Sequence, residues 1–285
     1  MTTGFANPWE HVRLLSDAPR NDAMIALLAR RAPGARVLEV GCGTGLLSCV
    51  AARLGATRVF AVEPTPLAEV ARALVAENGL AGVVEVVRAR VEDVPPLPVD
   101  LAFSELLNAD PFVEGVLPAM DAAAAWGGRL APRRLRVWAA LARAGGSARE
   151  YRAARAEVRR LGDRHGLRVG ALEGALATRE AYVTVTATES PVGPPVLVWD
   201  LALGAGERPS DRAVTLSASE PGPVAGVLVW FEAELDDELV LANPPGAGGH
   251  WGQLLASFAE ERGVRAGEGV HVEIGVRDGG VTVRA

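Results

Sequence analysis

The chain has 285 residues, of which 49% are hydrophobic and 22% charged, and its formal net charge is −6. This composition supports a folded protein with one large core or two smaller ones, and the acidic balance argues against a nucleic-acid partner, which would need a basic face. Cys42 and Cys49 suggest neither a disulfide framework nor a four-ligand zinc site, and no stretch approaches the ~20 apolar residues of a membrane span, so we expect a cytoplasmic protein with no membrane partner.

The first half of the chain predicts alternating helices and strands. A helix is expected over residues 22–31, with Asn21 or Asp22 as its N-terminal cap. Strands are then predicted at 36–40, 58–62, 83–88 and 99–103, and helices at 46–54, 66–78 and 112–125. Such alternation is typical of a doubly wound, Rossmann-like α/β domain with a parallel sheet. We expect this domain to span residues 35–141, preceded by a helical segment, residues 1–34, that covers its ligand.

The pattern changes after residue 141. A charged helix is predicted at 149–163, and runs with a period of two predict strands at 183–186, 196–199, 227–231, 271–274 and 281–283. Strands of this kind without intervening helices favour an antiparallel barrel or sandwich. We therefore expect residues 142–285 to form an antiparallel, β-barrel-like domain.

A glycine-rich turn follows the first predicted strand and would bind a nucleotide. The turn contains Gly41, Cys42, Gly43 and Gly45. Glu63 ends the next strand, where a carboxylate can accept hydrogen bonds from both ribose hydroxyls. The glycine spacing differs from the pyrophosphate fingerprint of NAD enzymes, and Glu39 at the strand end is typical of methyltransferases, so we expect S-adenosyl-L-methionine as cofactor. Glu92 follows the third strand, where such folds contact adenine; a solvated loop carboxylate is the alternative.

Two glutamates lie nine residues apart in the loop after the fourth predicted strand. Glu105 and Glu114 would stand at the carboxyl edge of the sheet, where open α/β folds bind ligands. A guanidinium is a planar fork that carboxylates match bidentately, so the pair can hold one and fix its plane. Carboxylates against two of its nitrogens would also draw positive charge there and free the third nitrogen to attack a methyl group. Either glutamate alone reads as a solvated loop residue, whereas the pair favours an acceptor site.

Four motifs in the same order resemble the protein arginine methyltransferase family. They are the glycine turn, the Glu105–Glu114 loop, residues 14–21 and residues 249–251. The opening of the loop, Ser-Glu-Leu-Leu, is similar to the symmetric-dimethylating branch. The resemblance implies that Arg20 pairs with the cofactor carboxylate, that His250 contacts Asp17 with both acting in catalysis, and that Trp251 lies at the substrate.

The chain also departs from the family pattern. Glycine replaces the family's threonine before His250, and the family's N-terminal tyrosine motif is absent, since the only tyrosines are Tyr151 and Tyr182. The segment 149–176 is short for the family's dimerisation arm, so a homodimer is left open.

The sequence thus predicts a compact bacterial arginine N-methyltransferase that transfers a methyl group to a guanidino nitrogen of arginine. The arginine could be free or part of a peptide or protein, and natural-product biosynthesis is a plausible setting. Two alternatives stay open: a class I methyltransferase for a non-guanidine small molecule, and a catalytically silent scaffold that binds the cofactor. The remaining histidines, His11, His165 and His271, show no ligand spacing, so no metal is expected.

Overall fold

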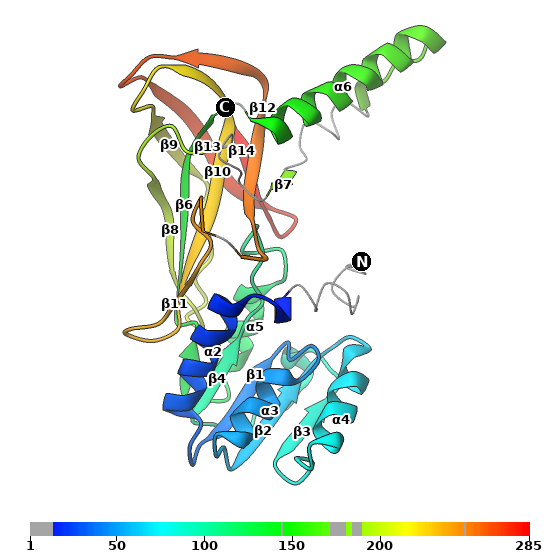
Figure 1. The fold of residues 1–285 in the computed structure, drawn as a ribbon, viewed down its shortest axis with the longest axis vertical. Coiled ribbons are helices and arrows are strands. Elements are labelled where there is room, and N and C mark those ends of the chain that lie inside the picture. Colours follow the sequence, from blue (N-terminus) through cyan, green and yellow to red (C-terminus); the bar gives the residue numbers. More distant parts are fainter. Residues whose placement is uncertain (1–13, 144, 172–180, 184–189, 248) are drawn as a thin grey trace.

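The computed structural model describes residues 14–143, 145–171, 181–183, 190–247 and 249–285. It consists of an α/β part and a larger β part (Figure 1). Two predictions fall partly outside the described residues: the N-terminal segment, at residues 1–13, and the strand at 183–186, at residues 184–186. Among the described residues, no helix combines the length and apolar character needed to cross a bilayer.

The α/β part contains one parallel sheet with the strand order β3-β2-β1-β4-β5. Its strands are β1 (Arg36–Val40), β2 (Arg58–Val62), β3 (Val84–Val87), β4 (Leu101–Ser104) and β5 (Arg129–Ala131), and its helices are α3 (Leu46–Arg53), α4 (Leu67–Glu77), α5 (Val116–Ala124) and the short η1 (Val91–Asp93). The chain runs outward from β1 to β3 and then returns to place β4 on the other side of β1. The carboxyl ends of β1 and β4 therefore flank the switch point where doubly wound sheets bind ligands. The predicted fold class is confirmed for this part.

The helix before the sheet, α2 (Ala18–Arg31), begins earlier than predicted. Its cap is Asp17, whose side chain accepts a hydrogen bond from the Arg20 backbone N–H at 3.1 Å; the predicted caps, Asn21 and Asp22, lie inside the helix. Pro19 is tolerated because the first turn of a helix needs no backbone donor there. The earlier start places Arg20 on the buried side of the helix, together with Met24 and Leu27.

The β part contains two antiparallel sheets that share a core. One has the order β7-β12-β10-β6-β8 with β11 beside β10, and the other has the order β14-β13-β9. The strands are β6 (Arg134–Arg143), β7 (Ala181–Val183), β8 (Val196–Ala202), β9 (Arg212–Ser217), β10 (Gly222–Glu234), β11 (Val240–Ala242), β12 (Gln253–Val264), β13 (Gly269–Arg277) and β14 (Gly280–Arg284). Residues from both sheets belong to one hydrophobic cluster, so the predicted antiparallel domain is confirmed and takes the form of two packed sheets.

The sequence placed β6 in the wrong part of the molecule. We expected the first domain to extend to residue 141, but β6 pairs with β10 along its whole length and with β8 on its other side. The change of sheet therefore falls between β5 and β6. We predicted no strand over β6, so the sequence did not mark the point where the chain leaves the parallel sheet.

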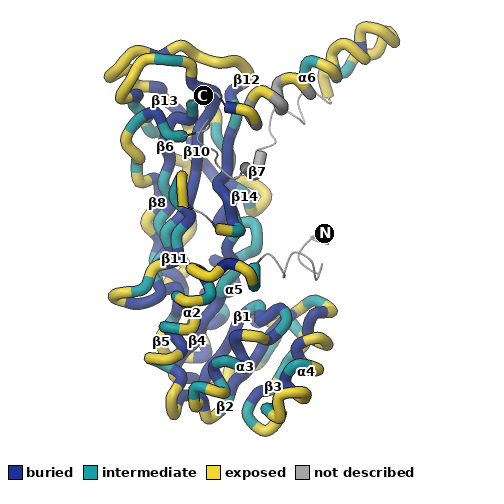
Figure 2. Tube along the Cα trace, in the orientation of Figure 1, coloured by how far each residue is buried: buried dark blue, intermediate teal, exposed yellow. Residues whose placement is uncertain are grey.

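Helix α6 (Gly146–His165) extends beyond the predicted 149–163 and projects away from the β part (Figure 1). Most of its described residues are exposed (Figure 2). Leu161, near its end, and Leu167, just beyond it, are among the exposed large apolar side chains. The helix therefore contributes little to the core.

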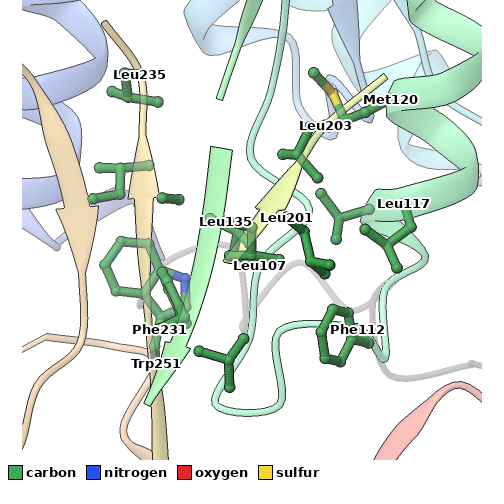
Figure 3. Packing of buried hydrophobic residues seen from close by; sticks show 14 of the residues in the cluster. Leu107, Phe112, Leu117, Met120, Leu135, Leu201, Leu203, Phe231, Leu235 and Trp251 are labelled. Carbon is green, nitrogen blue, oxygen red and sulfur yellow. The ribbon is translucent and has the colours of Figure 1, made fainter. Parts of the chain in front are cut away.

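The two parts of the molecule share one hydrophobic core. In Figure 3, Phe112 and Leu117 of the α/β part lie close to Leu201 of β8. The ring of Phe112 meets the ring of Trp199 edge-on, with centroids 5.7 Å apart and an interplanar angle of 74°. Because this core is continuous, the β part is held firmly over the carboxyl edge of the parallel sheet.

Candidate active site

The predicted cofactor turn connects β1 to α3 and has the backbone that its glycines suggest. Gly41, Gly43 and Gly45 have φ angles of 73°, 54° and 78°, in the left-handed region that glycine adopts without strain. The Gly43 N–H donates to Glu63 Oε2 at 2.9 Å. The other oxygen of Glu63 accepts from the Thr65 N–H, also at 2.9 Å. The structure thus places Glu63, the residue predicted to bind the ribose, against the predicted glycine turn.

Gly41 packs against the loop after β4. A Cβ atom on Gly41 would lie 2.6 Å from Cδ2 of Leu106, so a larger residue would displace the Leu106 side chain. Leu106 directly follows Glu105, so the glycine turn lies beside the start of the acceptor loop.

Two buried groups lie under the turn. The Ser48 hydroxyl donates to the carboxyl group of Glu39, and burial raises the pKa of Glu39 to about 8. Burial likewise raises the pKa of the Cys42 thiol well above its usual range, so Cys42 fills space in the turn without thiolate character. The expected contact of Cys42 with the cofactor stays a prediction.

Glu92 lies in η1, after β3, where the sequence placed an adenine contact. Its Oε1 accepts a hydrogen bond from Arg90 Nη2 at 2.9 Å. This bond is local, between two neighbours in a partly exposed loop, and the adenine contact stays a prediction.

The acceptor loop, residues 105–114, begins at the end of β4 with Glu105. Oε2 of Glu105 accepts from Nε of Arg20 at 2.8 Å and also from Arg20 Nη2. Oε1 accepts from the indole N–H of Trp251 at 3.1 Å. Glu105 therefore links α2, the parallel sheet and the β part. The sequence assigned Arg20 to the cofactor carboxylate, whereas the contact in the structure is with Glu105; a contact with the cofactor stays a prediction.

Glu114 lies at the other end of the acceptor loop, in surroundings that disfavour its ionised form. Its Oε1 accepts a hydrogen bond from Nδ2 of Asn108 at 2.9 Å. Burial first, and the negative charge of Glu105 second, raise the pKa of Glu114 to about 8. The negative charge of Glu105 thus acts on Glu114, and their convergence on one acceptor stays a prediction. A guanidinium placed between them would relieve the repulsion and favour the ionised form of Glu114.

Asp17 and His250 are in direct contact, as the resemblance implied. The His250 backbone N–H and ring Nδ1 both lie against Asp17 Oδ2, at 2.9 Å and 2.8 Å. Burial acts to raise the pKa of Asp17, but the hydrogen bonds from His250 outweigh it and hold this pKa below its usual value. Gly249 allows the approach, because a Cβ atom there would lie only 3.2 Å from Asp17 Oδ2.

Trp251 packs beside this contact and is buried. Its ring meets Phe231 edge-on with centroids 5.4 Å apart, and it lies 4.5 Å from the His250 ring. Its indole N–H is used by Glu105. In the structure, then, Trp251 contacts the acceptor glutamate, and its predicted contact with the substrate itself stays a prediction.

We expect Asp17→Asn and His250→Gln each to reduce turnover while cofactor affinity changes only a few-fold. Asparagine is an equally good helix cap, so Asp17→Asn should preserve α2 and lose mainly the charge facing His250. Since both variants remove the same contact, the double variant should be little worse than either single one. Steady-state kinetics of the four proteins measure this, with His165→Gln on the exposed α6 as the matched control. Additive losses would mean that the two residues act independently.

Two polar residues inside the acceptor loop, Asn108 and Asp110, were not among the predicted site residues. The Asn108 Oδ1 accepts from the Ala109 N–H at 2.8 Å, which fixes the amide so that its NH₂ group faces Glu114. Asp110 is buried and accepts from the Phe112 N–H at 3.0 Å. The sequence signal was an Asp-Pro pair, which indicates a turn and nothing about its partners.

Comparisons with known proteins identify the family of this chain. The family described as "Methyltransferase domain" matches residues 37–128. An arginine N(omega)-methyltransferase from Streptomyces achromogenes subsp. streptozoticus is 32% identical over 288 residues, covering 95% of this chain and 77% of the relative. Protein arginine N-methyltransferase PRMT10 from Arabidopsis thaliana is 27% identical over 296 residues, covering 91% and 77%.

The fold is also found among solved structures. The Trypanosoma brucei PRMT1 enzyme-prozyme heterotetrameric complex with AdoHcy matches with a TM-score of 0.81 and 21% identity, covering 95% of this chain and 88% of that chain. The likeness extends over both parts of the molecule, as does the similarity to the Streptomyces enzyme. The chain therefore belongs to the arginine N-methyltransferase family of class I, S-adenosylmethionine-dependent methyltransferases.

Proposed function

We propose that this protein methylates a guanidino nitrogen of arginine and that Glu105 and Glu114 bind the acceptor. The observation that supports the proposal is the carboxylate at each end of the acceptor loop: Glu105 already accepts hydrogen bonds from the guanidinium of Arg20, and Glu114 is close enough to feel its charge. Each carboxylate oxygen has two lone pairs, so Glu105 can accept from a second guanidinium while it keeps its bonds to Arg20 and Trp251. One oxygen of Glu114 accepts a hydrogen bond from Asn108, and both of its carboxylate oxygens can accept further bonds.

The residues around β1 fit the cofactor that the family uses. The three glycines of the Gly41–Gly45 turn place no side chain between the backbone and a nucleoside, and the buried Glu63 carboxylate lies beside the turn. Bound S-adenosylmethionine supplies an electrophilic methyl group on sulfur. We assign Glu63, with Gly41, Gly43 and Gly45, to holding the nucleoside, and Arg20 to the cofactor carboxylate in addition to Glu105.

The acceptor loop then performs the positioning. Glu105 and Glu114 hold two nitrogens of the guanidinium in one plane, and the third nitrogen is left to form the new C–N bond as the C–S bond breaks. Methyl transfer leaves the guanidinium with an extra positive charge, so one of its nitrogens must lose a proton. Glu114 is the group we assign to accept it, because it would be ionised beside the bound guanidinium and would contact one of its N–H groups directly. The ring of His250 is bonded to Asp17 instead.

The form of the acceptor is part of the proposal. Free L-arginine or a peptide arginine is our first choice, because the Streptomyces relative is named an arginine N(omega)-methyltransferase. We keep natural-product biosynthesis as the proposed setting.

A homodimer also stays a proposal, supported by the projecting α6, which leaves Leu161 and Leu167 exposed; light scattering on the purified protein measures it.

Methyl transfer from labelled S-adenosylmethionine tests the proposal. The acceptors are L-arginine, short arginine peptides, the same peptides with lysine in place of arginine, and a cell lysate, with products identified by mass spectrometry. We expect label on guanidino nitrogens and none on the lysine peptides. Label on a non-guanidine small molecule alone would support the first alternative, and cofactor binding without turnover on any acceptor would support the scaffold.

A further inference from the structure

The middle of the acceptor loop is attached to the last hairpin of the chain. Asp110 lies halfway between Glu105 and Glu114, and only 2% of its surface is exposed. Its Oδ1 accepts from the Phe112 N–H within the loop, at 3.0 Å. Its Oδ2 accepts from the Val281 N–H of β14 at 2.7 Å, across a sequence separation of 171 residues. The carboxylate therefore has one oxygen on the loop and one on the β part.

The hairpin offers this donor because β14 is an edge strand. The sheet order is β14-β13-β9, so one side of β14 has no neighbouring strand within its sheet. On an edge strand, alternate N–H groups point away from the partner and need another acceptor. The Val281 N–H is such a donor, and Asp110 satisfies it. Gly280 permits the close approach, since a Cβ atom there would lie 3.0 Å from Asp110 Oδ2.

A buried carboxylate at this place is costly, which argues that the contact is specific. Burial raises the pKa of Asp110, and the two backbone hydrogen bonds act against that effect. Among the described ion pairs none involves Asp110, so the two N–H groups are the partners that fix its orientation. An apolar residue would fill the space without the penalty but could not bind the strand edge.

The contact complements the one at the start of the loop. Trp251 of the β part holds Glu105, and Val281 of the β part holds Asp110. Phe112, two residues further on, packs against Trp199 of β8. Glu114 is thus attached to a loop whose course is fixed by the β part at successive points, while the cofactor turn is held separately by Glu63.

We propose that Asp110 is a positioning residue: by binding the edge of the C-terminal hairpin, it fixes the acceptor loop so that Glu114 faces the same guanidinium as Glu105. The inference rests on the proposed role of the two glutamates as acceptor ligands. It assigns the hairpin β13–β14, at the far end of the sequence, to the alignment of the acceptor and not to cofactor binding.

Two variants remove the bond from opposite sides. Asp110→Asn keeps an oxygen for the Phe112 N–H but turns an NH₂ group toward the Val281 N–H. Val281→Pro removes the donor, and proline is tolerated on an edge strand. Val281→Ala keeps the donor while trimming the same buried side chain, so it is the matched control. For Asp110→Asn and Val281→Pro we expect kcat/KM for the arginine acceptor to fall about 10- to 100-fold, the scale of a displacement near 1 Å.

The affinity for S-adenosylhomocysteine should stay within about twofold in both variants, because the nucleotide turn does not use this bond. Val281→Ala should keep most of the activity. The double variant Asp110→Asn/Val281→Pro should have a kcat/KM no lower than that of the less active single variant. Wild-type kcat/KM in both single variants would overturn the inference. So would a loss of cofactor affinity in both, since the bond would then support the whole fold. Glu114→Gln, assayed in parallel, separates this failure from that of the proposed function: only the latter predicts a fully active Glu114→Gln.

Discussion

Glutamine at position 105 or 114 should lower turnover by about 10²-fold or more, the scale observed when a preorganised electrostatic partner is removed. Each substitution removes one of the two charges that localise the positive charge of the acceptor. The amide also turns an NH₂ group toward the N–H groups of the guanidinium, which repel it. The double variant should in addition lose affinity for arginine, because two charge-assisted contacts vanish together. Single-turnover and steady-state kinetics with labelled S-adenosylmethionine measure both effects.

The two single variants should differ in stability, which provides an internal control. The pKa of Glu114 is raised to about 8 in the folded state, so the free energy of unfolding falls as the pH rises from the unfolded pKa of this carboxyl toward 8. Glutamine removes this cost, so Glu114→Gln should not lower the Tm at neutral pH. Glu105→Gln leaves the buried Arg20 without its charged partner and should lower the Tm. Glu157→Gln, on the exposed α6, is the matched control. If both glutamine variants methylate arginine at the wild-type rate, the carboxylates do not bind the acceptor, and only the methyltransferase assignment survives.

Glu63→Ala should weaken S-adenosylhomocysteine binding by about 1.5–3 kcal/mol, which is about 10- to 150-fold in Kd. The substitution removes the carboxylate that we assign to the ribose. It also releases the N–H groups of Gly43 and Thr65, so the turn loses the group that orders it. Glu63→Gln should be milder, because its single carbonyl oxygen can still accept from one of these donors.

Isothermal calorimetry without the acceptor measures the effect directly. Glu69→Ala, an exposed glutamate on the neighbouring α4, removes the same charge without touching the turn and should bind normally. A Kd for Glu63→Ala within about twofold of the wild type would contradict the assignment of Glu63 to the nucleoside.

Much of the α/β part could be predicted because its strands are short and mostly buried. β1 and β2 begin and end where their β-branched runs do. β12 was missed since its first half is buried on both faces and its second half is exposed, so no period of two marks it. The start of α2 was placed too late because Asn21 or Asp22 was expected to cap it, whereas the cap is Asp17 and Pro19 lies in the first turn.

The site was predictable in its members and less so in its contacts. The spacing after β4 indicated both glutamates, and the resemblance supplied the contact between Asp17 and His250. The pairing of Arg20 with Glu105 was not foreseen, because residues 85 positions apart meet only through tertiary packing. Polar residues such as Asn108 and Asp110 look alike in a sequence until their partners are known.

The distance along the chain between the halves of each contact affects how the enzyme is made. The glycine turn and Glu63 can come together as soon as the α/β part leaves the ribosome, because their partners are about twenty residues apart. The partners of Asp17 and Asp110 lie 233 and 171 residues further on. During synthesis the nascent protein can therefore form its cofactor turn long before its acceptor site is complete. A polypeptide interrupted before Trp251 lacks the indole N–H that donates to Oε1 of Glu105. One interrupted before Val281 lacks the N–H that donates to Oδ2 of Asp110. The last hairpin therefore supplies the last partner along the chain for the acceptor loop, whereas the contact between Gly43 and Glu63 lies wholly within the α/β part.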